Sequence, residues 1–116
     1  MQIIEVKKLD TWPAPTSTDV KDGKLLVSKL NEFFYLTIGF PGMKTGDQID
    51  TTIVIKYDKY SPPVSWHSRF PAEQDNSETF KFPLTLFGGT FDNGTGSITF
   101  TAKDQPSAAL EFSINP

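Results

Sequence analysis

The chain has 116 residues, a net charge of -3 at pH 7 and no cysteine, so it fits one domain and carries neither disulfides nor cysteine-based metal or catalytic sites. Its acidic balance, with no basic cluster longer than Lys7-Lys8, disfavours nucleic-acid binding, which needs an excess of positive charge. No apolar run approaches the roughly 20 residues of a membrane span, and the N-terminus lacks a signal-peptide core, so we expect no membrane insertion.

The first fifteen residues predict a lead-in rather than a regular strand. Residues 2–6 are apolar enough for a short strand, but Trp12-Pro13-Ala14-Pro15 follows. Proline has no N–H to donate to a ladder. We therefore expect residues 1–15 to form a lead-in strand and a Pro-rich linker that crosses one end of a single domain, residues 1–116.

Apolar and polar residues then alternate with the period of two that is typical of half-buried antiparallel strands. Phe34, Leu36 and Ile38 share one face, whereas Phe33, Tyr35, Thr37 and Gly39 lie on the other. Thr51 interrupts an apolar face formed by Ile49, Ile53 and Ile55. The pattern predicts strands over residues 24–30, 33–40, 48–57, 64–70, 78–87, 96–103 and 109–115.

Turn-forming residues separate these segments at short intervals, which favours a β-sandwich or a barrel. The predicted turns are Asp22-Gly23, Gly42, Gly46-Asp47, Pro62-Pro63, Asp75-Asn76, Gly88-Gly89, Asn93-Gly94 and Gln105-Pro106.

One stretch, from Phe40 to Ile49 (FPGMKTGDQI), resembles the "GM..GD.I" segment of bacterial immunoglobulin-like repeats, which occur in large surface, adhesin-like and secreted proteins. The resemblance extends over residues 13–115, from Asp22-Gly23-Lys24-Leu25 to the closing strand. The chain departs from the pattern at Ile55-Lys56-Tyr57-Asp58, where the family usually has Trp-x-Gly. The resemblance implies an all-β, immunoglobulin-like antiparallel β-sandwich with seven to eight strands, Greek-key connections and a spacing or adhesive role.

No catalytic or metal-binding pattern emerges from the sequence. His67 is the only histidine and no G-x-S-x-G segment exists, so we expect no enzyme and no zinc site. Calcium needs several converging oxygen ligands, which loop carboxylates could supply. The simpler explanation of carboxylates in loops is that they form hydrogen bonds that stabilise turns and caps. The loop carboxylates concerned are Asp47, Asp50, Asp58, Asp92 and Asp104. We expect no cofactor, with calcium as the alternative.

Aromatic and hydrogen-bonding residues mix between residues 57 and 67, as they do in sugar- and peptide-binding sites. The candidate ligand-binding residues are Tyr57, Tyr60, Trp66 and His67. The competing interpretation is that Trp66 is the core tryptophan of the sandwich and that Tyr57 packs against it.

Three functional hypotheses follow. The first is a non-catalytic immunoglobulin-like module that acts in adhesion, spacing or protein binding within a bacterial surface or secreted protein. The second is a small stand-alone carbohydrate-binding, lectin-like sandwich that uses Tyr57, Tyr60 and Trp66, and the third is a phage or virion decoration protein. The partner is accordingly a protein or a glycan. The location is extracellular or cell-surface for a module of a larger protein, and cytoplasmic for a complete stand-alone product.

Overall fold

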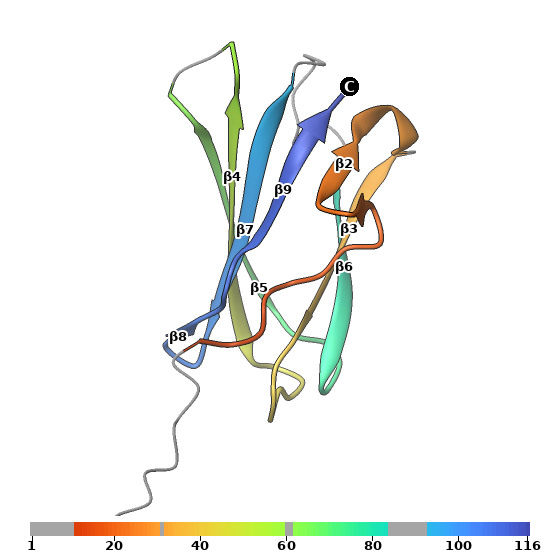
Figure 1. Cartoon of the computed structure of the whole chain (residues 1–116). Helices are drawn as coiled ribbons and strands as arrows, with labels where there is room; N and C mark the ends of the chain where they lie inside the picture. The colour runs from red at the N-terminus through yellow and green to blue at the C-terminus, as the bar shows by residue number, and fades with distance from the viewer. Residues whose placement is uncertain (1–10, 31, 60–61, 84–92) are drawn as a thin grey trace, which may run out of the picture.

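The computed structural model describes residues 11–30, 32–59, 62–83 and 93–116, and it arranges their strands in two facing sheets (Figure 1). The larger sheet has seven strands in the order β1-β2-β9-β7-β4-β5, with β8 paired to β7. Its strands are β1 (Val20–Lys21), β2 (Lys24–Leu26), β4 (Gln48–Tyr57), β5 (Val64–Pro71), β7 (Gly94–Ala102), β8 (Gln105–Pro106) and β9 (Leu110–Asn115). The smaller sheet pairs β3 (Phe33–Gly39) with β6 (Ser77–Pro83).

The chain passes repeatedly between the two sheets, as Greek-key sandwiches require. It leaves β2 for β3, returns for the β4–β5 pair, crosses again to β6 and finishes with β7, β8 and β9. All strand pairs are antiparallel except β2 and β9, which are parallel. The prediction of an all-β sandwich is thus confirmed, and the larger sheet includes one parallel pair.

Most predicted strands agree with the observed ones to within two residues. The main difference is the strand expected over residues 24–30, which ends at Leu26 and is followed by a 3-10 helix, η1 (Val27–Lys29). This turn is needed because the chain must leave the larger sheet there and enter the smaller one. The strand expected over residues 2–6, and the end of the one expected over 78–87, lie outside the described residues.

The inner faces of the two sheets form one connected hydrophobic core. Phe34, Leu36 and Ile38 of β3 are fully buried, as the alternation predicts. The ring of Phe34 stacks on that of Phe112 in β9, with 6.3 Å between centroids. This contact joins the smaller sheet to the larger one.

The proline-containing lead-in ties the two sheets together at their margin. Trp12 bridges to Ser107 beside β8, and Thr16 bridges to Thr37 of β3, so the two pairings lie on either side of the prolines. The indole of Trp12 stacks on Phe40 at 4.8 Å, and its Nε1–H donates to the carbonyl of Ala102 at 2.9 Å. Trp12 therefore packs against the core as a structural tryptophan.

Two tight hairpins have their central residues in the left-handed region, the geometry of type I′ turns. The predicted Asp22-Gly23 turn is one of them, with φ of 53° and 73°. The turn predicted at Gln105-Pro106 is wrong, because those residues form β8 and the chain reverses at Lys103-Asp104, with φ of 52° and 59°. Neither Lys103 nor Asp104 is a glycine, so the usual turn signal is missing at this place.

In the part of the chain that the structure describes, the two strands of the smaller sheet leave part of the inner face of the larger sheet uncovered. At one end of β5, Phe70 packs on Phe80 of β6 with 4.3 Å between ring centroids. Toward the other end, Val64 and Trp66 remain 44% and 43% exposed. The interpretation of Trp66 as the core tryptophan is therefore wrong.

Among the described residues, no helix has the length and apolar character to cross a membrane.

Candidate functional site

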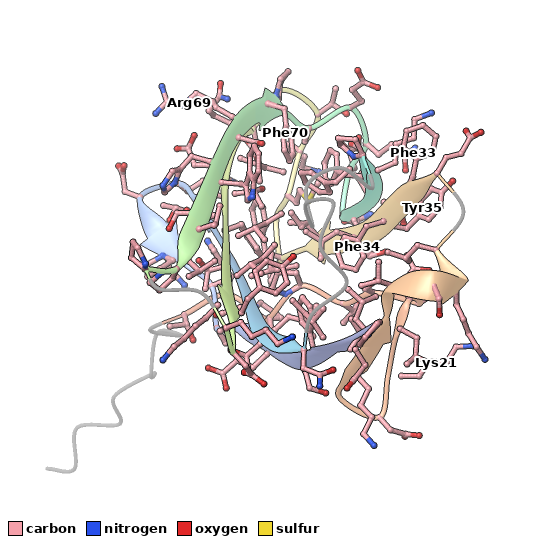
Figure 2. All side chains as sticks on the ribbon, turned by 90° about the horizontal axis from the view of Figure 1, so that it is seen from above. Lys21, Phe33, Phe34, Tyr35, Arg69 and Phe70 are labelled. Carbon is pink, nitrogen blue, oxygen red and sulfur yellow. The ribbon has the colours of Figure 1, made fainter. Side chains whose placement is uncertain are left out.

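The outer face of the smaller sheet carries two aromatic residues where alternation would normally place polar ones. Phe33 and Tyr35 point away from the core while Phe34 between them points into it (Figure 2). Tyr35 is 43% exposed, and the rings of Phe33 and Tyr35 meet edge to face with 6.4 Å between centroids. Lys81 of β6 places its Nζ 4.6 Å from the centroid of Phe33. We call Phe33, Tyr35 and Lys81 the aromatic face.

The backbone of Tyr35 is held by the segment that covers the free edge of β3. Its N–H donates to Oδ2 of Asp19 at 2.9 Å, and its carbonyl accepts from the hydroxyl of Ser17. The same hydroxyl accepts from the N–H of Asp19 at 3.1 Å. Thr16 and Thr37 exchange two backbone hydrogen bonds next to this point. The lead-in thus fixes the strand that carries Tyr35 and brings a carboxylate beside it.

A hollow of about 490 Å³ opens beside the aromatic face. Its lining residues are Asp19, Lys29, Glu32, Phe33 and Tyr35. A second hollow of about 280 Å³ shares Asp19 and Lys29 with the first. It is also lined by Thr18, Lys21, Asp22, Lys24, Leu26 and Leu30. The two hollows therefore adjoin, and we call them together the recess.

The charges around this recess balance. Three lysines (Lys21, Lys24 and Lys29) and three carboxylates (Asp19, Asp22 and Glu32) line it. Lysine can only donate hydrogen bonds, whereas an ionised carboxylate can only accept them. The recess thus offers both donors and acceptors beside an exposed ring, without a strong net field that would select an ion.

The structure does not bring the sequence-predicted site residues together on one surface. Tyr57 is 8% exposed and belongs to the core, while Trp66 is exposed on the inner face of β5. His67 follows Trp66 in the same strand and therefore points to the opposite face. There its Nδ1 lies 3.2 Å from the hydroxyl of Thr52. Tyr60 lies outside the described residues.

Two of the loop carboxylates considered as calcium ligands, Asp47 and Asp50, have other partners. Asp47 accepts from the N–H of Lys44 at 2.9 Å and lies 3.6 Å from Nζ of Lys103. Asp50 pairs with Arg69 at 2.6 Å. Asp92 lies outside the described residues. Within the described ranges, no three His, Asp or Glu side chains gather closely enough to hold a metal ion.

The sequence contained one signal for the aromatic face that the site prediction did not use. Phe33 and Tyr35 alternate with the buried residues of β3, so they fall on its outer face. Two large rings on the solvent side of a strand are unusual, because exposed aromatic area is normally buried or used for binding. Lys81 and Asp19 join them only through the strand pairing and the path of the lead-in, which periodicity does not encode.

No family model, curated protein or solved structure matches the chain. The resemblance to bacterial immunoglobulin-like repeats therefore stays a prediction that rests on the residues quoted for it.

Proposed function

We propose that this chain is a non-catalytic binding module that takes a carbohydrate on the aromatic face and in the recess beside it. The observation that carries the proposal is the exposed ring of Tyr35 beside a hollow of about 490 Å³ that is lined by one lysine and two carboxylates. Sugars present an apolar C–H face and a rim of hydroxyl groups, and binding sites for such ligands combine flat rings with a few placed polar groups.

The charges that line this hollow favour a neutral, hydroxyl-rich ligand over an anionic one. Each sugar hydroxyl can donate one hydrogen bond and accept others. Lys29 can donate to it, while Asp19 and Glu32 can accept from it. A phosphate or a sulfate would meet those two carboxylates, and like charges repel.

The Tyr35 platform is also held in place before any ligand arrives. Ser17 and Asp19 bind both backbone polar groups of Tyr35. A ring on a strand that is bonded along both edges loses little freedom on binding, and such preorganisation supports affinity.

The resemblance to bacterial immunoglobulin-like repeats supports a wider proposal: the domain acts in adhesion as a module of a bacterial surface or secreted protein. A glycan-binding face suits such a role, because adhesive contacts of this kind are made to sugars displayed on other surfaces. The spacer and decoration hypotheses predict no specific sugar binding, and the stand-alone lectin hypothesis places it at Tyr57, Tyr60 and Trp66 rather than at Tyr35.

A glycan array followed by calorimetric titration with the best monovalent oligosaccharide tests the proposal. We expect Tyr35→Ala to abolish binding while the circular dichroism spectrum and the melting temperature stay close to those of the parent chain. Trp66→Ala is a matched control, because Trp66 and Tyr35 are each 43% exposed and occupy different sheets.

Three results would contradict the proposal. Binding that survives Tyr35→Ala would remove the aromatic face from the site. Binding abolished by Trp66→Ala alone would move the site to β5. An array without hits, for a folded protein, would favour the spacer hypothesis.

A further inference from the structure

The described sheet edges differ in how far they are protected against pairing with another chain. Segment 16–19 covers the outer edge of β3, and β1 at the end of the larger sheet is only two residues long. The outer edge of β6 carries Lys81 and ends at Pro83. Short length, charged side chains (lysine above all) and proline are the usual devices that keep an edge from pairing.

The edge formed by β5 is less protected, because its one charged side chain of fixed sign, Arg69, is paired with Asp50 of β4 at 2.6 Å. The strand runs for eight residues, contains no lysine, and has proline only at its last position, Pro71. Among the described residues, β5 pairs with β4 alone. Its residues from Val64 to His67 are exposed on both faces of the sheet.

Hydrogen bonds next to β4 establish which backbone groups of β5 face outward. Asp58 donates its N–H toward β7, to Asn93, whereas the carbonyl of Asp47 accepts from Ala72, which follows β5. Because bonding directions alternate along a strand, the even-numbered residues of β4 bond to β7 and its odd-numbered residues bond to β5. The odd-numbered residues of β4 pair with even-numbered residues of β5, so it is the even-numbered residues of β5 that bond to β4. The N–H and C=O groups of Ser65, His67 and Arg69 therefore point away from the sheet.

This outward set is symmetric about His67. Pro63 and Pro71 lie four residues on either side of it, and neither has an N–H. We propose that β5 is a self-pairing edge, to which β5 of a second copy adds antiparallel about a two-fold axis at His67. In this register His67 pairs with the partner's His67, Ser65 with the partner's Arg69, and the prolines end the ladder at both sides.

Side chains on both faces fit this register. On the inner face, Trp66 lies opposite the partner's Ser68, a small residue that leaves room for the indole, and the exposed Val64 lies opposite the partner's Phe70. On the outer face, Arg69 meets the partner's Ser65 and keeps its ion pair with Asp50 at 2.6 Å. No like-charged carboxylates or lysines are brought opposite each other.

The absence of cysteine from the sequence allows a direct test of the register. Two residues that form a hydrogen-bonded antiparallel pair have Cα atoms about 5.5 Å apart, within the reach of a disulfide. We therefore expect His67→Cys to form an intermolecular disulfide under mild oxidation. Ser65→Cys is the matched control: it is exposed on the same face of the same strand, but its two copies would be about 13 Å apart.

The unmodified chain supplies the second measurement. Sedimentation equilibrium up to about 1 mM, the range expected for a small interface, should show a rise toward twice the monomer mass. Cross-linking that is equal in the two cysteine variants, or absent in His67→Cys, would overturn the proposal. A parent chain that stays monomeric up to this concentration would also overturn it. The same holds if the β5 amides of that monomer become protected from hydrogen exchange only when an extended peptide is added, because the edge would then pair with a peptide and not with a second copy.

Discussion

Gly96 lies directly opposite Phe112 in the β7–β9 ladder, and a β-carbon built on Gly96 would approach Cζ of that ring to 2.4 Å. The phenyl ring therefore lies over the glycine and reaches the ring of Phe34 in the smaller sheet. The contact between the two sheets depends on the space above Gly96, which only a residue without a side chain leaves for the ring.

We predict that Gly96→Ala lowers the free energy of unfolding by about 2–3 kcal/mol, because overpacking of a close-packed core forces rings and backbone apart. Urea unfolding measures the loss. The double variant Gly96→Ala/Phe112→Leu should lose less unfolding free energy than the two single variants lose in sum, since the smaller leucine side chain leaves room for the added methyl group. Additive losses would show that the methyl group is accommodated in another way.

The alternation of apolar and polar residues was sufficient to predict the long strands, because each of them buries one face and the period of two reports that face directly. It could not predict how far the opposite sheet extends. Trp66 and Ile53 are cross-strand partners on the same inner face, yet one is 43% exposed and the other 1%. The difference arises because, among the described residues, the covering sheet consists of β3 and β6 and leaves Trp66 exposed.

The candidate site was harder to predict for a related reason. Trp66 and His67 are neighbours in sequence, but in a strand such neighbours point to opposite faces. The aromatic face instead combines β3, β6 and the lead-in, so that Tyr35 and Asp19 meet across 16 residues of sequence. Such contacts follow from strand pairing between segments and not from the local pattern of either one.

The Lys103-Asp104 turn offers a simple stabilising change. Both residues have positive φ, a region that costs L-residues with a β-carbon free energy and costs glycine none. We expect Asp104→Gly to raise the free energy of unfolding by about 0.5–1 kcal/mol. Gly23→Ala, at φ +73° in the other hairpin and without a contact within 4 Å, should lower it by a similar amount. Thermal unfolding of both variants measures the two changes in stability, and a lower stability of Asp104→Gly would contradict the backbone argument.

Thr51 is the residue that interrupts the apolar face of β4, and it is buried at 1% exposure. Its hydroxyl oxygen has no hydrogen-bond partner within the part of the chain that the structure describes, and a buried hydroxyl without a partner is destabilising. Thr51→Val keeps the shape and removes the polar atom, so we predict a gain of about 1–2 kcal/mol in unfolding free energy. Thr52→Val is the control on the solvent side, where the hydroxyl already meets His67, and it should bring no comparable gain.

The pKa of Asp75 lies below its ordinary value because its Oδ1 accepts hydrogen bonds from the backbone N–H of Thr45 at 2.8 Å and from the hydroxyl of Thr45 at 3.0 Å. A carboxyl whose folded-state pKa is depressed stabilises the fold at pH values above its unfolded-state pKa, which is about 3.9. That contribution is lost as the pH falls through the folded-state pKa. Stability should therefore decline on acidification below about pH 4.

Thr45→Val tests the cause of this shift. It removes the hydroxyl and leaves the backbone N–H in place, so the pKa of Asp75 should rise part of the way toward its ordinary value. An NMR titration of the Asp75 carboxyl carbon measures both chains. An unchanged pKa would mean that the hydroxyl of Thr45 contributes nothing to the depressed value.

Asp19 has two roles in the proposed carbohydrate site, since it holds the N–H of Tyr35 and lines both hollows of the recess. Asp19→Ala removes one acceptor for a sugar hydroxyl and one restraint on the Tyr35 platform. A hydrogen bond to a charged group contributes about 1.5–3 kcal/mol, so we expect affinity for the monovalent oligosaccharide to fall at least about tenfold. Glu111→Ala, on the outer face of the larger sheet, should leave affinity unchanged. Equal affinities for the parent chain and Asp19→Ala, measured by calorimetry, would place the ligand away from the recess.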